Sequence, residues 1–542
     1  MKKLSRRDFV KLSAVGLGSF ILSACGVKDK PTGYAPAHAG KNATPEATSE
    51  ATAVPLPTTG ADSAIPSIAT PGATQDAGTS GKGQKNNTGK QGKGQKDGTA
   101  PSSGNPDFIA TEIAGRPTNN SITTNIVPAV AMSLYYEYGT QSGQYTSKTP
   151  VQAATAGTPL ETLFSGLQPN TRYYYRVNYN GKTTGHMPGP ERTCVTQRVP
   201  GSSFSFAIQG DSHPERLGRE FTPEFYALTL AAAAADKPDF YMTIGDDFSV
   251  DTLHTVNADT VRALYVNQRQ WLGQVNVPVF LLNGNHEQAA QANLNGTANN
   301  VAVWAQTSRN SLYPQPAPDS FYSGDSGNVQ FVGSLRDYFA FTWGDALFVV
   351  LDQYWHSPVT VDNQFGADRD NKSKRDLWQV TIGDDQYKWF KNVLATSTAK
   401  YKFVFSHHVL GTQRGGTDVA NKYEWGDAAN LAAHRPGWDK TIHQVMVDNH
   451  VNIYFQGHDH LFVRQELDGV IYQTLPQPAD PNYASVNANS YRTGDKLPNT
   501  GYVRVNVSPA KVTVDYVRTY LPKDETGGHK SGEVAFTYNI QG

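Results

Sequence analysis

Six short polar clusters in this 542-residue chain each follow a run of apolar, strand-like residues. Short apolar runs rich in β-branched and aromatic residues predict buried strands. Because ligands bind beyond the carboxyl ends of the strands in open α/β sheets, the six junctions predict one common site. The runs are Phe204–Ile208, Phe240–Ile244, Val277–Leu282, Ala346–Leu351, Tyr401–Phe405 and Val451–Phe455, and the clusters begin at Gly210, Gly245, Asn283, Asp352, Ser406 and Gly457.

The clusters are made mainly of aspartate, asparagine and histidine, which are metal-ligand types. Imidazole suits zinc, iron and manganese, whereas carboxylate and amide oxygens suit harder divalent ions. The set is too large for one structural zinc, which takes four ligands. Shared between two ions with one bridging carboxylate, it fits a site in which ions about 3.5–4 Å apart stabilise an in-line displacement at phosphorus.

The order of these motifs resembles the calcineurin-like metallophosphoesterase superfamily. The matching elements are Asp-x-His, Gly-Asp, Gly-Asn-His-Glu, a His after a strand, and Gly-His-x-His, and the similar region covers roughly residues 202 to 520. The resemblance implies a two-sheet α/β sandwich with metal ions at the strand ends along one edge. In this sequence the motif residues are Asp211, His213, Asp246, Asn285, His286, His407, His458 and His460.

The resemblance also implies a role for each residue. Asp246 would bridge the two ions, and a hydroxide between the ions would attack phosphorus. His286 would contact the phosphoryl oxygens or protonate the leaving group, and we expect Glu287 to orient it, as carboxylates do for imidazoles. One ion would be held by Asp211, His213 and His460, and the other by Asn285, His407 and His458.

Some histidines and one aspartate need a separate interpretation. His407 is favoured over His408 as a ligand because the family's usual ligand is the residue nearer the strand, and His408 stays open as the alternative. Asp352 follows a strand but belongs to no ligand motif, so we expect a structural carboxylate there. The remaining lone histidines, His356 among them, are expected to be ordinary surface or core residues.

The stretch after Asp246 departs from the pattern of purple acid phosphatases. Those enzymes carry a tyrosine ligand a few residues after the bridging aspartate, and this chain reads Asp246-Asp247-Phe248-Ser249-Val250. A ferric-tyrosinate centre is therefore not expected. The two divalent or mixed-valence ions could be manganese, zinc or iron, because geometry and availability decide more than raw affinity.

The N-terminus predicts export. Ser5-Arg6-Arg7-Asp8-Phe9 resembles a twin-arginine signal, and the apolar run Leu12–Ala24 is too short to span a bilayer as a mature helix. Leu22-Ser23-Ala24-Cys25 resembles a lipoprotein signal, in which lipid is attached to Cys25. An ordinary secretory signal with a chance arginine pair is the alternative. We expect a protein that is exported across the cytoplasmic membrane and anchored by lipid on its outer side.

Composition divides the rest of the chain. Residues 26–104 are poor in aromatic and large aliphatic residues, so we expect a disordered linker after the signal at residues 1–25. With Cys25 lipidated, Cys194 is the one remaining thiol, and no intramolecular disulfide can form. The net charge of −1 predicts no specific nucleic-acid partner. The oligomeric state is not predicted.

Residues 105–199 are expected to form an all-β sandwich before a metallophosphoesterase domain at residues 200–542. Leu167-Gln168-Pro169-Asn170-Thr171-Arg172-Tyr173 resembles the corner of fibronectin type III-like domains, which precede the catalytic domain in purple acid phosphatase-like enzymes. In the second domain, spacing predicts helices over Pro223–Ala235, Ala258–Val275, Asp385–Leu394 and Trp438–Asp448, and late strands over Gly501–Val507 and Lys511–Val517.

These features together predict an exported phosphoesterase that hydrolyses a small phosphorylated substrate. A monoesterase is favoured because the preceding sandwich resembles the acid phosphatase arrangement. A phosphodiesterase or a nucleotidase with the same site stays open, since family alone does not fix the substrate. From a different class, a cell-surface binding protein with a vestigial metal site also stays open.

Overall fold

The computed structural model describes residues 105–181, 185–362, 364–365, 376–409 and 413–542. The expected signal, the linker and Cys25 lie outside these residues. Among the described helices, none combines the length and the apolar character needed to cross a membrane.

The first described region is built of two antiparallel sheets. One contains β1 (Phe108–Gly115), β2 (Ser121–Pro128) and β6 (Leu160–Ser165). The other contains β3 (Met132–Gly139), β4 (Ser147–Lys148), β5 (Gln152–Ala154), β7 (Arg172–Gly181), β8 (Gly185–Pro188) and β9 (Arg192–Val195).

Side chains from both of these sheets form one apolar core. The Tyr173 hydroxyl accepts a hydrogen bond from the backbone N–H of Gln168 at 2.9 Å, which fixes the entry to β7. The region is therefore β-rich and consistent with the expected sandwich. Its likeness to fibronectin type III domains stays a prediction.

The remainder is a mixed α/β structure with two large sheets. The six-stranded sheet has the order β12 (Val279–Leu281), β11 (Phe240–Thr243), β10 (Phe204–Gln209), β23 (Gly501–Val507), β24 (Lys511–Arg518), β25 (Glu533–Gln541). The eight-stranded sheet has the order β13 (Ser323–Gly324), β16 (Phe339–Trp343), β17 (Ala346–Val350), β18 (Tyr401–Phe405), β19 (Ile453–Gln456), β21 (Val470–Thr474), β20 (Phe462–Leu467), β22 (Asp495–Leu497). A separate hairpin pairs β14 (Asn328–Val329) with β15 (Gly333–Ser334).

Aromatic side chains pack the two sheets against each other. The ring centroid of Phe348 on β17 lies 5.1 Å from that of Phe206 on β10 and 5.4 Å from that of Phe240 on β11. Because side chains alternate across a strand, Val404 points to the opposite face from Phe403 and Phe405 and joins a different core. The expected two-sheet α/β sandwich is thus confirmed.

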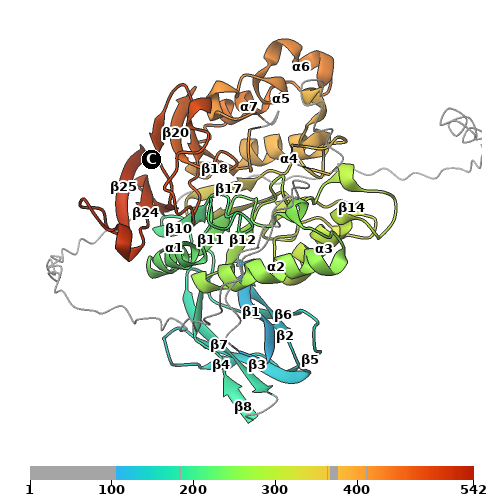
Figure 1. The fold of residues 1–542 in the computed structure, drawn as a ribbon, viewed down its shortest axis with the longest axis vertical. Helices are drawn as coiled ribbons and strands as arrows, with labels where there is room; N and C mark the ends of the chain where they lie inside the picture. Colours follow the sequence, from blue (N-terminus) through green and yellow to red (C-terminus); the bar gives the residue numbers. More distant parts are fainter. Residues whose placement is uncertain (1–104, 182–184, 363, 366–375, 410–412) are drawn as a thin grey trace, which may run out of the picture. The chain divides into compact units, whose positions relative to one another are not determined.

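Helices cover the two outer faces (Figure 1). The core that includes Ala207 of β10 and Tyr241 of β11 is shared with α1 (Pro223–Ala235), α2 (Ala258–Leu272) and α3 (Val301–Leu312). The core on the other side includes Val404 of β18 and is shared with α4 (Gly383–Thr396), α5 (Tyr423–Gly426), α6 (Ala428–His434) and α7 (Ile442–Asp448).

The predicted elements agree closely, with one clear exception. The helix at Pro223–Ala235 and the strand at Gly501–Val507 have the predicted bounds. The helix predicted from Trp438 begins only at Ile442, because the Thr441 side chain accepts a hydrogen bond from the Gln444 N–H and caps it there. Trp438 stacks instead on Tyr387 of α4, with ring centroids 3.8 Å apart.

A buried arginine attaches the N-terminal strands to the α/β region. Arg269 on α2 donates from Nε to the Thr111 carbonyl at 2.7 Å and from Nη1 to Asn125 Oδ1 at 2.6 Å. It also donates to the carbonyls of Leu312 and Asn125. Burial lowers the pKa of Arg269 to about 10, so the guanidinium stays charged at neutral pH. The first region is therefore a packing partner of α2.

Candidate metal centre

The metal-ligating candidates gather where strands of both sheets end. Those from the six-stranded sheet follow the parallel strands β10, β11 and β12, and those from the eight-stranded sheet follow β18 and β19. Each side chain is buried, with no residue more than 6% exposed. The residues brought together are Asp211, His213, Asp246, Asn285, His286, His407, His458 and His460.

The first predicted ligand trio converges in the structure. Asp211, His213 and His460 place donor atoms within 4.8 Å of one another. His460 Nε2 lies 3.0 Å from Asp211 Oδ2 and 3.2 Å from His213 Nε2. At this spacing all three side chains could coordinate one metal ion.

Asp246 lies between this trio and the second predicted set. Its Oδ2 is 3.7 Å from His213 Nε2 and 3.1 Å from His407 Nε2. His407 Nε2 is in turn 3.1 Å from Asn285 Oδ1. One carboxylate oxygen therefore faces both groups, which is the position that a bridging ligand requires.

His458 and His408 complete the second side of the centre. Together with His407 they form another cluster of possible ligands, and the rings of His408 and His458 stack with centroids 4.5 Å apart. His408 Nδ1 lies 2.9 Å from Gln353 Nε2 and 3.1 Å from the Tyr354 hydroxyl. His407, by contrast, faces Asp246, so the preference for His407 stays the better-supported prediction.

Acceptors behind the imidazoles fix their orientation. His213 Nδ1–H donates to Glu215 at 2.9 Å, and His460 Nδ1–H donates to Glu220 at 2.9 Å. His407 Nδ1–H donates to the Ile244 carbonyl at 2.9 Å. Because these oxygens can only accept, the Nε2 atoms of the three rings point toward the cluster. Metal-binding histidines in proteins commonly have this arrangement.

Asp251, and not Glu287, orients His286. Asp251 Oδ1 lies 2.7 Å from His286 Nδ1. The Glu287 carboxylate instead accepts the backbone N–H groups of Gly284 at 2.8 Å and Asp247 at 2.9 Å. The expectation for Glu287 was therefore wrong, because its side chain turns back to brace the two loops that follow β11 and β12.

A guanidinium faces His286 at the exposed side of the cluster. Arg216 Nη2 lies 3.4 Å from His286 Nε2, and its Nη1 donates to Glu220 at 2.7 Å. Sequence reasoning missed Glu215, Arg216, Glu220 and Asp251. Their one sequence signal is position, since all four lie within about ten residues after a predicted ligand.

The protonation states suit cation binding. Burial opposes ionisation of Asp211 and Asp246, but the surrounding imidazoles outweigh it and hold the pKa of both carboxyls well below the usual range. Burial keeps the pKa of His458 well below its ordinary value, so this ring is neutral. Its Nε2 makes no hydrogen bond within the described part of the chain, and Asp362 Oδ2 lies 3.5 Å away. Burial opposes protonation of His407, but Asp246 and Asp211 outweigh it and raise the pKa of this ring to about 10, so a cation held there would take the place of that proton. Ionised carboxylates, imidazole nitrogens and a carboxamide oxygen fit divalent zinc, manganese or iron.

Unusual backbone conformations place these side chains. The φ angles of His213 (+45°), Asp246 (+57°), His458 (+67°) and His460 (+57°) are positive, which is uncommon for residues other than glycine. Such conformations persist where surrounding structure imposes them, and they gather at functional sites. Gly457 is needed for lack of space, since a Cβ there would collide with Asp211 Oδ1 and the Ile244 side chain.

Asp352 and Cys194, the other two residues singled out in the sequence, have structural roles. Asp352 Oδ2 accepts from Asn283 Nδ2 at 2.9 Å, and its Oδ1 accepts from the backbone N–H groups of Tyr354 and Trp355. It is the structural carboxylate that was expected. Cys194 is a buried thiol within the core of the N-terminal sheets.

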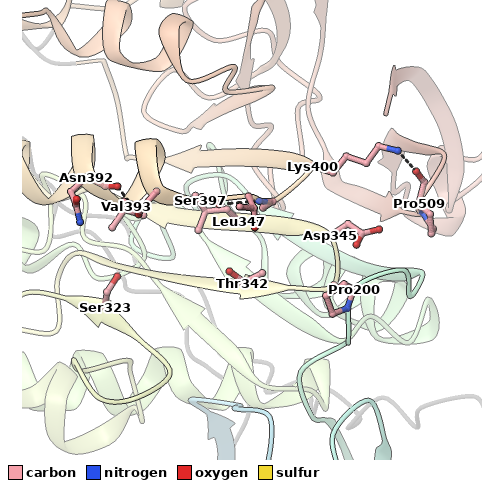
Figure 2. Close-up of a pocket in the computed structure, with 14 residues that line it drawn as sticks. Pro200, Ser323, Thr342, Asp345, Leu347, Asn392, Val393, Ser397, Lys400 and Pro509 are labelled. Carbon is pink, nitrogen blue, oxygen red and sulfur yellow. Dashed lines mark hydrogen bonds between the residues drawn. The ribbon is translucent and has the colours of Figure 1, made fainter. Parts of the chain in front are cut away.

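A groove of about 680 Å³ lies at the opposite ends of β17 and β18 from the metal candidates. Figure 2 shows Lys400 reaching Pro509 across it, and Lys400 Nζ donates to the Pro509 carbonyl at 2.6 Å. Asp345 accepts the Gly201 N–H at 2.8 Å. Both charged side chains of this groove thus make local structural contacts, and it gathers none of the candidate ligands.

Comparison with known proteins identifies similar folds. The family described as calcineurin-like phosphoesterase matches residues 204–462. No curated protein sequence matches the chain. A solved structure of PhoD is 15% identical with a TM-score of 0.57, covering 80% of this chain and 90% of that one. Purple acid phosphatase PPD1 from yellow lupin seeds is 14% identical with a TM-score of 0.51, covering 79% and 74%.

We predict that Gly457→Ala weakens metal binding and lowers the melting temperature. The added methyl group must displace the Asp211 carboxylate, and overpacking of this kind costs about 1–3 kcal/mol. Gly437→Ala is the matched control, because a Cβ at Gly437 meets no atom within 4 Å. Metal content by mass spectrometry and thermal unfolding are the measurements. Wild-type metal content and melting temperature in Gly457→Ala would contradict this role.

Proposed function

We propose that this protein, which carries a calcineurin-like metallophosphoesterase domain, hydrolyses phosphate monoesters with the help of two divalent cations. The observation that carries the proposal is the position of Asp246 Oδ2 between two groups of buried ligands. Asp211, His213 and His460 would hold one cation, and Asn285, His407 and His458 the other. When bound, such ions neutralise phosphoryl oxygens and activate water for attack at phosphorus.

The residues of the chain prepare the site before a substrate arrives. Glu215, Glu220 and the Ile244 carbonyl hold the imidazole Nε2 atoms inward, so little reorganisation is needed on binding. Arg216 places a guanidinium beside His286, where it can donate to a phosphoryl oxygen. A positioned cationic donor stabilises the charge that develops in the transition state.

His286 is proposed as the proton donor to the leaving group. Burial opposes its protonation, but Asp246 and Asp251 outweigh burial and raise the pKa of His286 to about 9. The ring therefore carries a proton at neutral pH. Asp251 accepts from Nδ1–H, so the Nε2–H is the proton that His286 would donate toward the substrate.

The choice of a monoester rests on a structural neighbour. The fold shared with a purple acid phosphatase favours a monoester. The structural match covers 79% of this chain, whereas residues 204–542 make up less than two thirds of it, so the match also includes N-terminal strands. A phosphodiesterase or nucleotidase would use the same ligands. A binding protein with a vestigial site is opposed by the intact donor set, including the oriented His286.

Export and lipid attachment complete the proposal. Cys25 would anchor the protein on the outer side of the membrane, and residues 26–104 would separate the anchor from the enzyme. Both features lie outside the described residues, and the motifs at Ser5–Phe9 and Leu22–Cys25 are their support. Radiolabelled palmitate incorporation in the wild type and in Cys25→Ala tests the anchor directly.

We expect the full chain to prefer a monoester. The protein is stripped of metal, reloaded with manganese or zinc, and assayed on nitrophenyl phosphate and on the bis-nitrophenyl diester. A higher kcat/KM on the monoester supports the proposal, whereas preference for the diester assigns the site to phosphodiesters. Absence of metal-dependent turnover on both would favour the binding-protein alternative.

A second prediction separates the two possible roles of His286. If it protonates the leaving group, His286→Asn should lower kcat/KM by about 10²–10⁴-fold on an alkyl phosphate and much less on nitrophenyl phosphate, whose leaving group needs no proton. Asp251→Asn should show the same selectivity with a smaller loss. Equal losses on both substrates would instead assign His286 to contact with the phosphoryl oxygens.

A further inference from the structure

A second group of possible ligands shares no residue with the candidate metal centre. Asp325, Asp337 and His356 place donor atoms within 4.8 Å of one another. Asp325 follows β13, Asp337 precedes β16, and His356 lies in the turn after β17. Three segments of the large sheet region therefore bring two carboxylates and one imidazole to one place.

Asp337 has one carboxylate oxygen paired with His356 and one that is buried and unpaired within the described part of the chain. Its side chain is 1% exposed, and its Oδ2 lies 2.9 Å from His356 Nε2. Its Oδ1 is buried and finds no hydrogen-bond partner among the residues that the structure describes. Burying a carboxylate oxygen away from water without a partner costs free energy of folding, and a bound proton or cation would remove this cost.

Asp325 adds a second buried carboxylate beside Asp337. It is 6% exposed, and its Oδ1 accepts the Gly327 N–H at 2.6 Å. Two neighbouring carboxylates repel each other when both are ionised. Burial and the charge of Asp337 raise the pKa of Asp325 to about 6.

Neighbouring charged groups do not resolve the conflict. The buried guanidinium of Arg309 donates to the carbonyls of Leu281 and Arg336 and not to these carboxylates. Asp352 is close enough for the charge of Asp337 to raise its pKa, and its carboxylate adds further negative charge. Among the described residues His356 is the cationic group within ion-pair distance of Asp337, and the charge of Arg309 acts on Asp337 from farther away.

We propose that Asp325, Asp337 and His356 bind a third divalent cation of the zinc or manganese type. Mixed carboxylate and imidazole donors suit these ions better than calcium, which prefers oxygen ligands alone. The His356 side chain is 19% exposed, so water can complete the coordination and the ion has a route of entry. Sequence reasoning treated His356 as an ordinary histidine, because its two partners lie about 20 and 30 residues earlier.

A cation at this site would stabilise the folded protein and would take no part in phosphate ester hydrolysis. Asp352, four residues before His356, accepts from Asn283, which begins the loop that carries Asn285 and His286. A cation tied to His356 would therefore stiffen the base of that loop. Ion binding to the folded state alone raises the melting temperature.

Zinc counting on the full chain tests the proposal. Wild type and variants are stripped with chelator, equilibrated with zinc, freed of excess ion and analysed by mass spectrometry. Asp325→Asn should bind one zinc ion fewer per chain than wild type and show a smaller zinc-induced rise in melting temperature. Its kcat/KM on nitrophenyl phosphate should stay within about twofold of wild type.

Two further variants make the result decisive. Asp385→Asn, which alters a solvent-exposed carboxylate on α4, should keep the wild-type zinc content. His356→Phe keeps a ring against Tyr338, removes the nitrogen ligands and should lose the same single ion, so it carries the test if Asp325→Asn does not fold. Wild-type zinc content in folded Asp325→Asn or His356→Phe overturns the proposal and leaves a proton shared between the two carboxylates.

Discussion

Two carboxylates, Asp211 and Asp246, are buried where strands of both sheets end, and much of the surrounding structure serves to keep them ionised there. Burial alone would favour their protonated forms. The imidazoles around them reverse that preference, and carboxylates behind His213 and His460 and a backbone carbonyl behind His407 fix these rings in turn. The result is a layered arrangement of charge whose centre suits cations. Removing one layer would leave the next without a partner.

The two-sheet packing makes this arrangement possible. Phe206, Phe240 and Phe348 hold the sheets together, so the ends of β10 and β11 lie beside those of β18 and β19. Each strand end then needs only a short loop to deliver a ligand. These loops are tightly packed, and backbones with positive φ aim the side chains inward. The catalytic candidates therefore depend on core packing as much as on their own chemistry.

The sequence predicted the strand ends and the motif residues, because apolar runs and fixed spacings are local features. The structure brings Asp211, His213 and His460 together as those motifs imply, whereas their ligand roles stay predictions. The partners of the imidazoles were not predictable, since Glu220 and Asp251 reach them only through loop conformations that spacing does not encode. Glu287 was misassigned for the same reason, because adjacent residues in a tight turn face opposite ways.

Substitution of Asp246 removes the carboxylate that would bridge the two cations. The full chain and Asp246→Asn are stripped of metal, reloaded with manganese or zinc, and compared for metal content and for turnover of nitrophenyl phosphate. We expect Asp246→Asn to bind less metal and to lose turnover by at least about 10²-fold, while circular dichroism shows an intact fold. Unchanged turnover in the folded variant would contradict a two-metal phosphoesterase centred on Asp246.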